Sequence, residues 1–422
     1  MNAFPRPSGR PARSFRASRE TIAVLDLGAS KAACAILHMK APRFGFNVGA
    51  RSIKILGSAA VSSSEFARAR IADPAAAAAR IRHALARAEA QARVTVEEAL
   101  ITGQFPGLRA ELFGARISGP QSHPGKENAR AIRAAAESRY AAVQRKLLNL
   151  FTSPIEIGPN QVQGRSCAGK ELDVVAVSMP LRGIREIEAC LAKSPLKARG
   201  YIAGPIAAAL AVTNPVERSA GILVIDIGAQ TAGWVYYSQG IPVLLDSFPA
   251  GGEQLTDEIA SAFGLSKSGA ERLKIRHGGI FNGLQADIDL PAANGYTGEK
   301  ISKFRFNRLV RSAASTLFDA INRRLKGAGY SIPVGGIVLT GGASSLPGLT
   351  ELASHVLEGE ARTARPALLD GLNPDSAMSA LVGACLYASR HQSEAEMLSA
   401  MGRASEDSSY ASRIGQWLRA SF

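Results

Sequence analysis

Two apolar stretches of the chain end in the same short pattern of an aspartate, an apolar residue and a glycine. The stretches are TIAVLDLGASKAACAIL (21–37) and GILVIDIGAQTAGWV (221–235). Continuous apolar runs bounded by turn residues predict buried strands, so each stretch is predicted to form a strand–turn–strand hairpin. The two aspartates, Asp26 and Asp226, are 200 residues apart, which indicates a duplicated lobe rather than an array of short repeats.

Other segments alternate between strand-like and helix-like patterns. Residues 73–92 predict a helix, with Asp73 as its N-cap and Pro74 in its first turn. Further strands are expected at 97–103 and 171–179, and further helices at 181–193, 204–213 and 304–327. The mixture of elements predicts an α/β protein.

A third glycine-rich element follows in the last quarter of the chain, GGIVLTGGASSLPGLTELASHVL (335–357). A strand is predicted to end at Gly341–Gly342, and a helix to begin near Ser344, because leucines and a valine recur from there at helical spacing. Twin glycines at a helix N-terminus allow a flat ring or a sugar to lie against the backbone. A simple strand-to-helix loop is the alternative for this element taken alone.

The two hairpin turns have the residue types of a phosphate site. Backbone N–H groups in a glycine turn form a cradle for anionic oxygens, and a carboxylate beside it can hold Mg²⁺ through water. For a single copy taken alone, a tight turn with a solvated acid is the favoured interpretation, and only the ordered set of glycine-rich elements shifts the balance toward a phosphate site. Neither turn is a dinucleotide fingerprint, because a strand rather than a helix is predicted to follow each one.

Composition narrows the class of protein. The chain has 422 residues, of which 46% are hydrophobic, and no uninterrupted apolar stretch of about 18 residues that would predict a membrane-spanning helix. Its four cysteines are far apart and form no Cys-x-x-Cys pair, which favours a reducing, cytoplasmic compartment. The net charge is +15, but the basic residues are spread out and no nucleic-acid module accompanies them, so no nucleic acid is expected as a partner.

The last residues, SRIGQWLRASF (412–422), form an amphipathic pattern behind a polar, small-residue stretch (391–411). The apolar residues share one helical face and the arginines lie mostly off it; the set comprises Arg413, Ile414, Trp417, Leu418, Arg419 and Phe422. Eleven helical residues reach about 16 Å, too short to cross a bilayer of about 30 Å. Such a helix can lie in an anionic membrane interface. Docking on the protein itself is the alternative.

The ordered set of motifs resembles the actin, Hsp70 and sugar-kinase superfamily, and within it the FtsA family of bacterial cell-division proteins. The resemblance covers residues 21–390 and the extreme C-terminus. It implies an actin-like two-lobed α/β fold with duplicated phosphate-binding hairpins, an FtsA-type inserted subdomain and a C-terminal amphipathic helix. It also implies ATP and Mg²⁺ as cofactors, with the metal held through water by Asp26 and Asp226.

The resemblance implies a set of nucleotide-binding residues and a domain plan. The residues are Asp26, Gly28, Ala29, Ser30, Lys31, Asp226, Gly228, Ala229, Gln230, Thr231, Gly251, Gly252, Glu271, Lys274, Gly341, Gly342, Ala343 and Ser344. The plan consists of a disordered basic arm (1–19), a first lobe (20–104 and 171–218), the inserted subdomain (105–170), a second lobe (219–252 and 335–390), an outer subdomain (253–334), a linker (391–411) and a membrane-targeting helix (412–422).

The second hairpin departs from the family pattern Asp-x-Gly-Gly-Gly-Thr-x-Asp. Ala229 and Gln230 replace two glycines, and Gly233 stands where the last acid is usual. If those positions need a positive φ, each replacement costs roughly 1 kcal/mol or more. Alternatively, Gln230 donates a hydrogen bond to a phosphate. Nucleotide binding is therefore expected, whereas hydrolysis is expected to be slow at most, and no catalytic residue is assigned.

The resemblance also implies partners and a location. An FtsA-type protein polymerises on the cytoplasmic face of the inner membrane at the division septum and anchors FtsZ, the tubulin-like division protein. The basic helix at 304–327 would bind the acidic C-terminal peptide of FtsZ, although a solvated helix face explains its charge equally well. Contacts between the inserted subdomain and downstream division proteins are left open. The alternatives are an actin-like scaffold of a pilus or secretion assembly, and a small-molecule kinase, for which no general base is evident.

Overall fold

The computed structural model describes residues 15–16, 20–40, 52–66, 71, 73–117, 126–152, 170–280, 287–292 and 295–390. Two sheets of five strands dominate these ranges, and both have the same strand order. The first sheet is β10 (Lys197–Ala203), β6 (Glu98–Gly103), β2 (Thr21–Leu27), β3 (Lys31–Lys40) and β4 (Ser52–Ser62). The second is β17 (Ala361–Thr363), β16 (Ile337–Thr340), β11 (Ile222–Ile227), β12 (Ala232–Ser238) and β13 (Ile241–Phe248).

The pairing confirms the two predicted hairpins. Strand β2 pairs antiparallel with β3, and β11 pairs antiparallel with β12, so each glycine turn joins two neighbouring strands. Each aspartate-bearing strand also pairs in parallel with a second strand, which places Asp26 opposite Thr102 and Asp226 opposite Thr340. The two sheets are therefore structural copies, as the repeated sequence pattern predicts.

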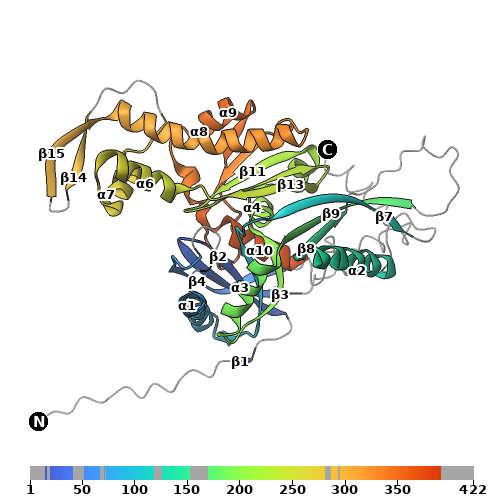
Figure 1. The fold of residues 1–422 in the computed structure, drawn as a ribbon. Helices are drawn as coiled ribbons and strands as arrows, with labels where there is room; N and C mark the ends of the chain where they lie inside the picture. Colours follow the sequence, from blue (N-terminus) through green and yellow to red (C-terminus); the bar gives the residue numbers. More distant parts are fainter. Residues whose placement is uncertain are drawn as a thin grey trace, which may run out of the picture.

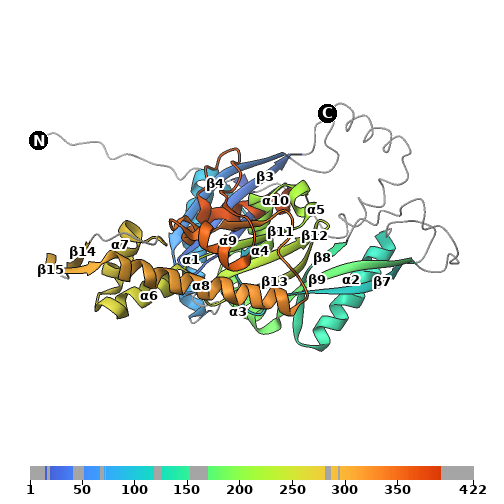
Figure 2. The same ribbon diagram turned by 90° about the horizontal axis from the view of Figure 1, so that it is seen from above.

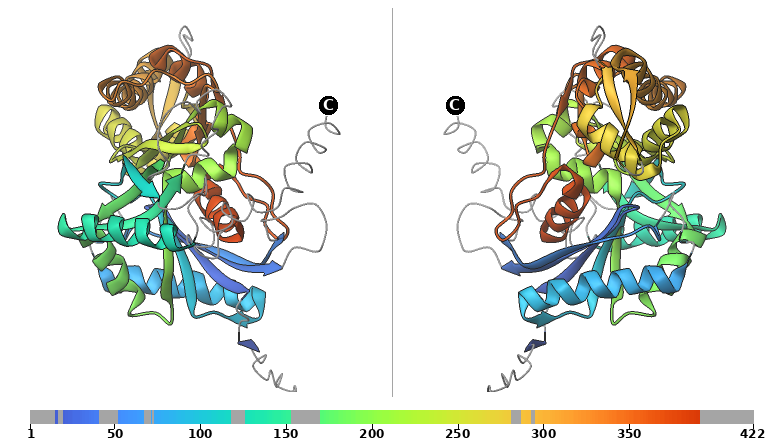
Figure 3. Two further views of the ribbon diagram at one scale, coloured as in Figure 1. Left: turned by 90° about the vertical axis from the view of Figure 1, so that its right-hand side faces the viewer. Right: turned by 90° about the vertical axis from the view of Figure 1, so that its left-hand side faces the viewer.

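Helices cover both faces of the first sheet. Helix α1 (Pro74–Ala92) packs on its outer face, and Asp73 caps it by accepting hydrogen bonds from the N–H groups of Ala75 and Ala76. Helix α10 (Ser379–Arg390) packs on the inner face, and Figure 3 shows the sheet between these two helices. Helix α4 (Gly204–Val212) lies between α10 and the second sheet. The interior of the molecule is therefore an α4–α10 pair between the two sheets (Figure 1).

A separate three-stranded sheet follows β6 in the chain. It has the order β7 (Arg109–Ile117), β9 (Lys170–Pro180), β8 (Arg145–Thr152), and α2 (Lys126–Ala142) packs on it around the buried Tyr140. The assignment of strand 171–179 to the first lobe is thus wrong, because β9 is the central strand of this sheet. Helix α3 (Leu181–Leu191) then returns the chain to α1.

The outer part of the second half is mainly helical. It contains α6 (Gly252–Phe263), α7 (Lys267–His277), the hairpin β14 (Asp287–Ala292) and β15 (Gly295–Ser302), and α8 (Lys303–Gly327). This part and the β7–β9–β8 unit lie at opposite ends of the molecule (Figure 2). We call the first sheet with α1 and α3 the first lobe, and the second sheet with this outer part the second lobe.

The element after β16 differs from its prediction. A short 3₁₀ turn, η2 (Gly342–Ser345), comes first, and helix α9 begins only at Leu349 and ends at Leu357. The helix therefore starts five residues later than the expected start at Ser344. Pro347 and Gly348 lie between the two elements, and Gly348 has φ +82°, which a helix interior does not allow.

The chain ends are described only in part. Residues Phe15–Arg16 form β1, which pairs in parallel with β5 (Val94–Thr95), so the prediction of a disordered arm over 1–19 is wrong at these two residues. The linker at 391–411 and the amphipathic helix at 412–422 lie outside the described residues. Within the described ranges, none of the helices combines the length and the apolar character needed to cross a membrane.

Candidate functional site

A cavity of about 770 Å³ lies between the two glycine hairpins. Its walls also include α6 and α7, the η2 turn, the first residues after β6 and part of α3. Small-molecule sites commonly enclose about 300–1,000 Å³, so the space suits a ligand of nucleotide size. Because residues of both lobes line it, a ligand in this cavity would contact the two lobes at once.

The two hairpin turns have nearly the same geometry. The N–H of Gly28 donates to the carbonyl of Lys31 at 3.0 Å, and the N–H of Gly228 donates to the carbonyl of Thr231 at 2.9 Å. A Cβ atom at Gly28 or Gly228 would come within 3.0 or 2.9 Å of the same carbonyl oxygens. Glycine therefore fits both positions without a shift of the backbone, which passes close to itself there.

The replacements in the second turn are not strained. Neither Ala229 nor Gln230 is among the non-glycine residues with positive φ, which are Arg93, Gln144, Gln239 and Glu358. A strain cost was expected only if these two positions needed a positive φ, and they do not have one. An alanine and a glutamine fit this turn with ordinary backbone angles.

Both aspartates are buried at the ends of their strands. Asp26 is 7% exposed and Asp226 is 8% exposed. Burial raises the pKa of Asp26 to about 7, where Lys31 acts to lower it and Asp226 to raise it. Burial likewise raises the pKa of Asp226 to about 6, opposed by the hydrogen bond from Gln104 and by Lys31. Two buried carboxyl groups that resist ionisation fit a site that a divalent cation completes, because its charge favours both ionised forms.

The loop after β6 brings in residues that the sequence reasoning missed. Gln104 donates from Nε2 to Asp226 Oδ2 at 2.7 Å, and both Gln104 and Phe105 line the cavity. A signal for this loop was present, since a strand pattern ending at Gly103 precedes it. Strand β6 pairs in parallel with β2, so its end lies at the same sheet edge as Asp26. The hydrogen bond from Gln104 to Asp226 could not be predicted from the sequence.

The wall formed by α6 and α7 is joined to the second hairpin by hydrogen bonds. The N–H groups of Gly252 and Glu253 donate to the carbonyls of Gly228 and Ala229, at 3.0 and 2.6 Å. A Cβ at Gly251 would lie 2.5 Å from the Ala229 carbonyl oxygen, so the twin glycines allow this close approach.

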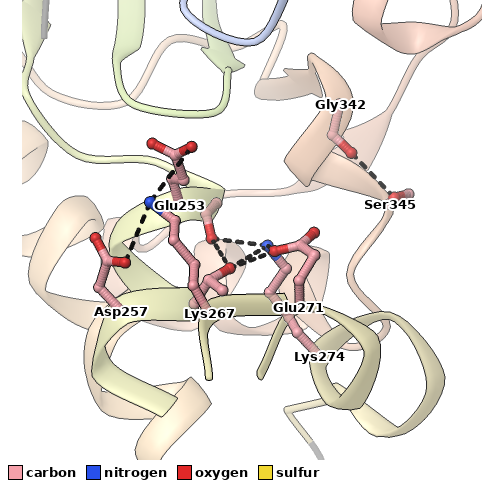
Figure 4. A network of polar contacts seen from close by, with 9 residues as sticks. Glu253, Asp257, Lys267, Glu271, Lys274, Gly342 and Ser345 are labelled. Carbon is pink, nitrogen blue, oxygen red and sulfur yellow. Dashed lines mark hydrogen bonds and ion pairs between the residues drawn. The ribbon is translucent and has the colours of Figure 1, made fainter. Parts of the chain in front are cut away.

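Charged residues on α6 and α7 form polar contacts along the same wall, as Figure 4 shows. Lys274 Nζ donates to the Gly252 carbonyl at 2.7 Å and pairs with Glu271 Oε2 at 2.8 Å. Lys267, which the sequence reasoning missed, lies between Glu253 at 3.6 Å and Asp257 at 3.3 Å. Three of these contacts connect α7 to α6, whose first N–H groups donate to the hairpin.

The η2 turn closes the cavity on the far side. Gly341 has φ +89°, and a Cβ there would come within 2.3 Å of Asp226 Oδ1, so only glycine fits. Ser344 is buried and donates from Oγ to the Gly341 carbonyl at 2.7 Å. Ser345 lies at the cavity instead and donates to the Gly342 carbonyl at 3.1 Å.

Most of the predicted nucleotide-binding residues meet at this cavity. Those that line it are Asp26, Gly28, Ala29, Ser30, Lys31, Asp226, Gly228, Ala229, Thr231, Gly252, Glu271, Lys274, Gly341, Gly342 and Ala343. Gln230, Gly251 and Ser344 are not among the lining residues. Gly251 and Ser344 shape the backbone behind the cavity, by the contacts given above.

Known proteins resemble the chain in sequence. The family model described as cell division protein FtsA matches residues 223–383. FtsA of Rhizobium meliloti (strain 1021) is 26% identical over 444 aligned positions, which cover 99% of this chain and 98% of that protein. FtsA of Pseudomonas aeruginosa is 27% identical over 282 positions, which cover 63% of this chain and 66% of that protein.

Solved structures resemble it in fold. The PilM–PilN type IV pilus biogenesis complex has a chain that matches with a TM-score of 0.61 at 17% identity, covering 87% of this chain and 98% of that one. MreB5 of Spiroplasma citri bound to AMPPNP matches with a TM-score of 0.51 at 14% identity, covering 88% and 96%. The chain therefore has an actin-like fold, and its sequence is similar along its length to the bacterial cell-division protein FtsA.

Proposed function

We propose that the chain is an ATP-binding protein of cell division and that Mg-ATP binds between its two lobes. The observation that carries the nucleotide site is the cavity with one glycine hairpin and one buried aspartate from each lobe. Backbone N–H groups of two opposed turns suit a chain of phosphates. Among the proteins of similar fold, MreB5 is bound to a nucleotide analogue, AMPPNP.

Each residue set has a distinct role in this proposal. The turns after Gly28 and Gly228 hold the phosphates, together with Lys31 and the hydroxyl of Thr231. Asp26 and Asp226 hold Mg²⁺ through water, and the metal neutralises phosphate charge when it is bound. Glu271 and Lys274 on α7, with Gly341, Gly342 and Ala343, form the wall for the nucleoside. Slow hydrolysis at most is proposed, since no residue at the cavity is assigned as a general base.

Binding of ATP to the full-length chain tests the site. In Mg²⁺, calorimetry is expected to show a single site, and Asp226→Asn is expected to weaken Mg-ATP binding about tenfold or more. Asp246→Asn is the matched control, because Asp246 is on β13 and pairs with Arg324 at 3.2 Å, and is not a lining residue of the cavity. Equal affinity of the two variants would show that the nucleotide site is elsewhere.

The division role is carried by similarity along the whole chain to FtsA proteins. We propose that the chain self-associates into actin-like filaments, lies on the cytoplasmic face of the inner membrane at the septum, and anchors FtsZ there. The pilus scaffold is the alternative, but the likeness to the PilM–PilN chain is one of fold at 17% identity.

The surface proposed for the FtsZ peptide is the first half of α8. Arg305 lies over the ring of Phe263 at 5.4 Å, and Arg308 is exposed one turn further along. Phe304 is 51% exposed beside them, which adds an apolar contact. In the second half of the helix, Arg324 and Lys326 are already paired, with Asp246 and Glu358. An acidic peptide with apolar side chains fits the first half better.

The membrane contact is proposed for residues 412–422. These residues lie outside the described ranges, so the proposal rests on their amphipathic sequence pattern. One short helix binds weakly, and a filament would present many copies to the same membrane. Self-association and membrane attachment would then support each other.

A further inference from the structure

The first residue after β6, Gln104, is held by unusually close backbone contacts. A Cβ at Gly204, the first residue of α4, would lie 2.6 Å from the carbonyl oxygen of Gly103 and 3.1 Å from the backbone N of Gln104. A Cβ at Gly103 would lie 3.0 Å from the carbonyl oxygen of Leu27. Because Gly103 and Gly204 have no Cβ, the backbone at Gln104 packs closely against both the start of α4 and the first hairpin.

The side chain of Gln104 is equally confined. Its Nε2 donates to Asp226 Oδ2 at 2.7 Å, the only orientation in which the amide satisfies the carboxylate, because the amide oxygen cannot donate. The amide lies directly over the Cα of Gly233, where a Cβ would come within 1.7 Å of Oε1. Oε1 is buried and accepts no hydrogen bond within the described residues. The amide is thus placed by its donor end, at the cost of an unsatisfied acceptor.

The Asp226 carboxylate is constrained on its other side as well. Its Oδ1 faces the Cα of Gly341, where a Cβ would lie 2.3 Å away. One oxygen therefore lies against the backbone of its own lobe, and the other accepts a hydrogen bond from a side chain of the first lobe. The two lobes are not equivalent here: the residue after the Thr-Gly pair is Gln104 beyond β6 but Gly342 beyond β16.

We propose that Gln104 is a positioning residue that reaches across the cleft and orients Asp226 toward the metal–phosphate end of the site. The acid of the second lobe is then correctly aimed only while the first lobe is in contact with it, so metal binding and lobe contact depend on each other. The inference rests on the proposed Mg-ATP site. It adds a residue that lies in neither glycine hairpin and acts through Asp226.

A second hydrogen bond between the lobes lies next to the first and provides a matched control. Ser247 on β13 donates from Oγ to the Phe105 carbonyl at 2.9 Å, one residue after Gln104. Ser247→Ala removes a contact between the same loop and the second lobe without touching Asp226. If Gln104 only holds the lobes together, the two losses should look alike.

The test measures how much Mg²⁺ strengthens ATP binding. Full-length wild type, Gln104→Met and Ser247→Ala are titrated calorimetrically with ATP in excess Mg²⁺ and in EDTA. Methionine fills the space of the amide but cannot donate, and Gln104→Ala serves as a second variant. In EDTA, both Gln104 variants are expected to bind ATP with an affinity within about twofold of that of wild type. The factor by which Mg²⁺ raises the ATP affinity is expected to be about tenfold or more smaller in both variants than in wild type. Ser247→Ala is expected to keep that gain.

A double-mutant cycle then asks whether Gln104 acts through Asp226. In an Asp226→Asn background, Gln104→Met is expected to have no further effect on the Mg²⁺ gain. The inference is overturned, with the ATP site intact, if wild type and Gln104→Met gain equally from Mg²⁺, if Ser247→Ala loses as much, or if the two substitutions are additive. It is also overturned if both Gln104 variants fail to fold. Wild type that binds no ATP under either condition contradicts the proposed function itself.

Discussion

At the residue scale, the two glycine hairpins show which features of the site can be predicted from sequence. An apolar run that ends in aspartate, an apolar residue and glycine predicts a strand followed by a tight turn, and the hairpins at Asp26 and Asp226 confirm this. The backbone angles of Ala229 and Gln230 could not be predicted, because they depend on how α6 holds the turn from outside. The N–H groups of Gly252 and Glu253 do so by donating to the turn carbonyls.

A glycine substitution tests the unstrained conformation of the second turn. Because Ala229 does not have positive φ, Ala229→Gly is expected to lower the free energy of unfolding by about 0.4–1 kcal/mol, through the greater entropy of the unfolded chain. Urea denaturation of both proteins measures it. An increase in stability would instead show that alanine is strained at this position.

Glu65 supports the first hairpin and has a pH-dependent role. It follows β4, where Ser63 donates its N–H to the Ser30 carbonyl at 3.1 Å. Although burial acts to raise it, hydrogen bonds from the Ser64 N–H, Arg80 and the Ser63 hydroxyl lower the pKa of Glu65 to about 2. A carboxyl with a lowered folded-state pKa adds stability above its ordinary range near 4.5, and this stability is lost as pH falls toward about 2.

Glu65→Gln is therefore expected to lower the free energy of unfolding at pH 7 by about 1–3 kcal/mol. The difference from wild type is expected to shrink as pH falls from about 4.5 toward 3. Urea unfolding across this range measures it. A difference that stays constant from pH 7 to pH 3 would show that Glu65 contributes by packing rather than by its charge.

At the element scale, local signals predicted the elements well and their partners poorly. Asp73 and Pro74 predicted the start of α1, and the basic helix was predicted within one residue as α8 (Lys303–Gly327). The strand at 171–179 was also predicted, but its sheet was not. Its neighbours β7 and β8 begin at Arg109 and Arg145, and nothing in the local pattern of β9 indicates pairing with segments so far away.

The crossing of α4 and α10 depends on one glycine. A Cβ at Gly383 would lie 1.5 Å from the carbonyl oxygen of Ala207, a backbone atom that cannot rotate away. Gly383→Ala is expected to force the helices apart and to lower the free energy of unfolding by about 1–3 kcal/mol or more. Gly327→Ala, where no atom lies within 4 Å of the new Cβ, is the matched control and is expected to be neutral or mildly stabilising. Equal effects in thermal denaturation would contradict the close crossing.

Charge reversal on α8 separates a binding surface from a solvated face. Arg308→Glu combined with Arg311→Glu is expected to weaken binding of an acidic FtsZ C-terminal peptide by about tenfold or more, because like charges repel across an interface. Arg323→Glu, on the same helix and exposed, is compared with Arg308→Glu alone as the control, because each of the two reverses one charge. Fluorescence anisotropy with a labelled peptide measures the affinities. Equal weakening by both proteins would indicate a general field effect rather than a local surface.

At the scale of the whole molecule, the order of motifs predicted the two-lobed arrangement, because each lobe carries its own glycine hairpin. The meeting of the lobes was beyond the sequence. Gln104 became a site residue only when the lobes were packed together, because its hydrogen bond is to Asp226 of the other lobe. In the proposed function, many copies of the chain form a filament that binds both the membrane and FtsZ.

The most direct test of that account is flotation of a labelled FtsZ C-terminal peptide with anionic liposomes and Mg-ATP, in the presence of the full-length chain. The full-length chain is expected to float and to carry the peptide with it. A chain that ends at residue 411 is expected to leave both at the bottom, and the Arg308→Glu, Arg311→Glu protein is expected to float without the peptide. Full-length protein that stays at the bottom, or a peptide that floats equally well with the truncated chain, would contradict the account.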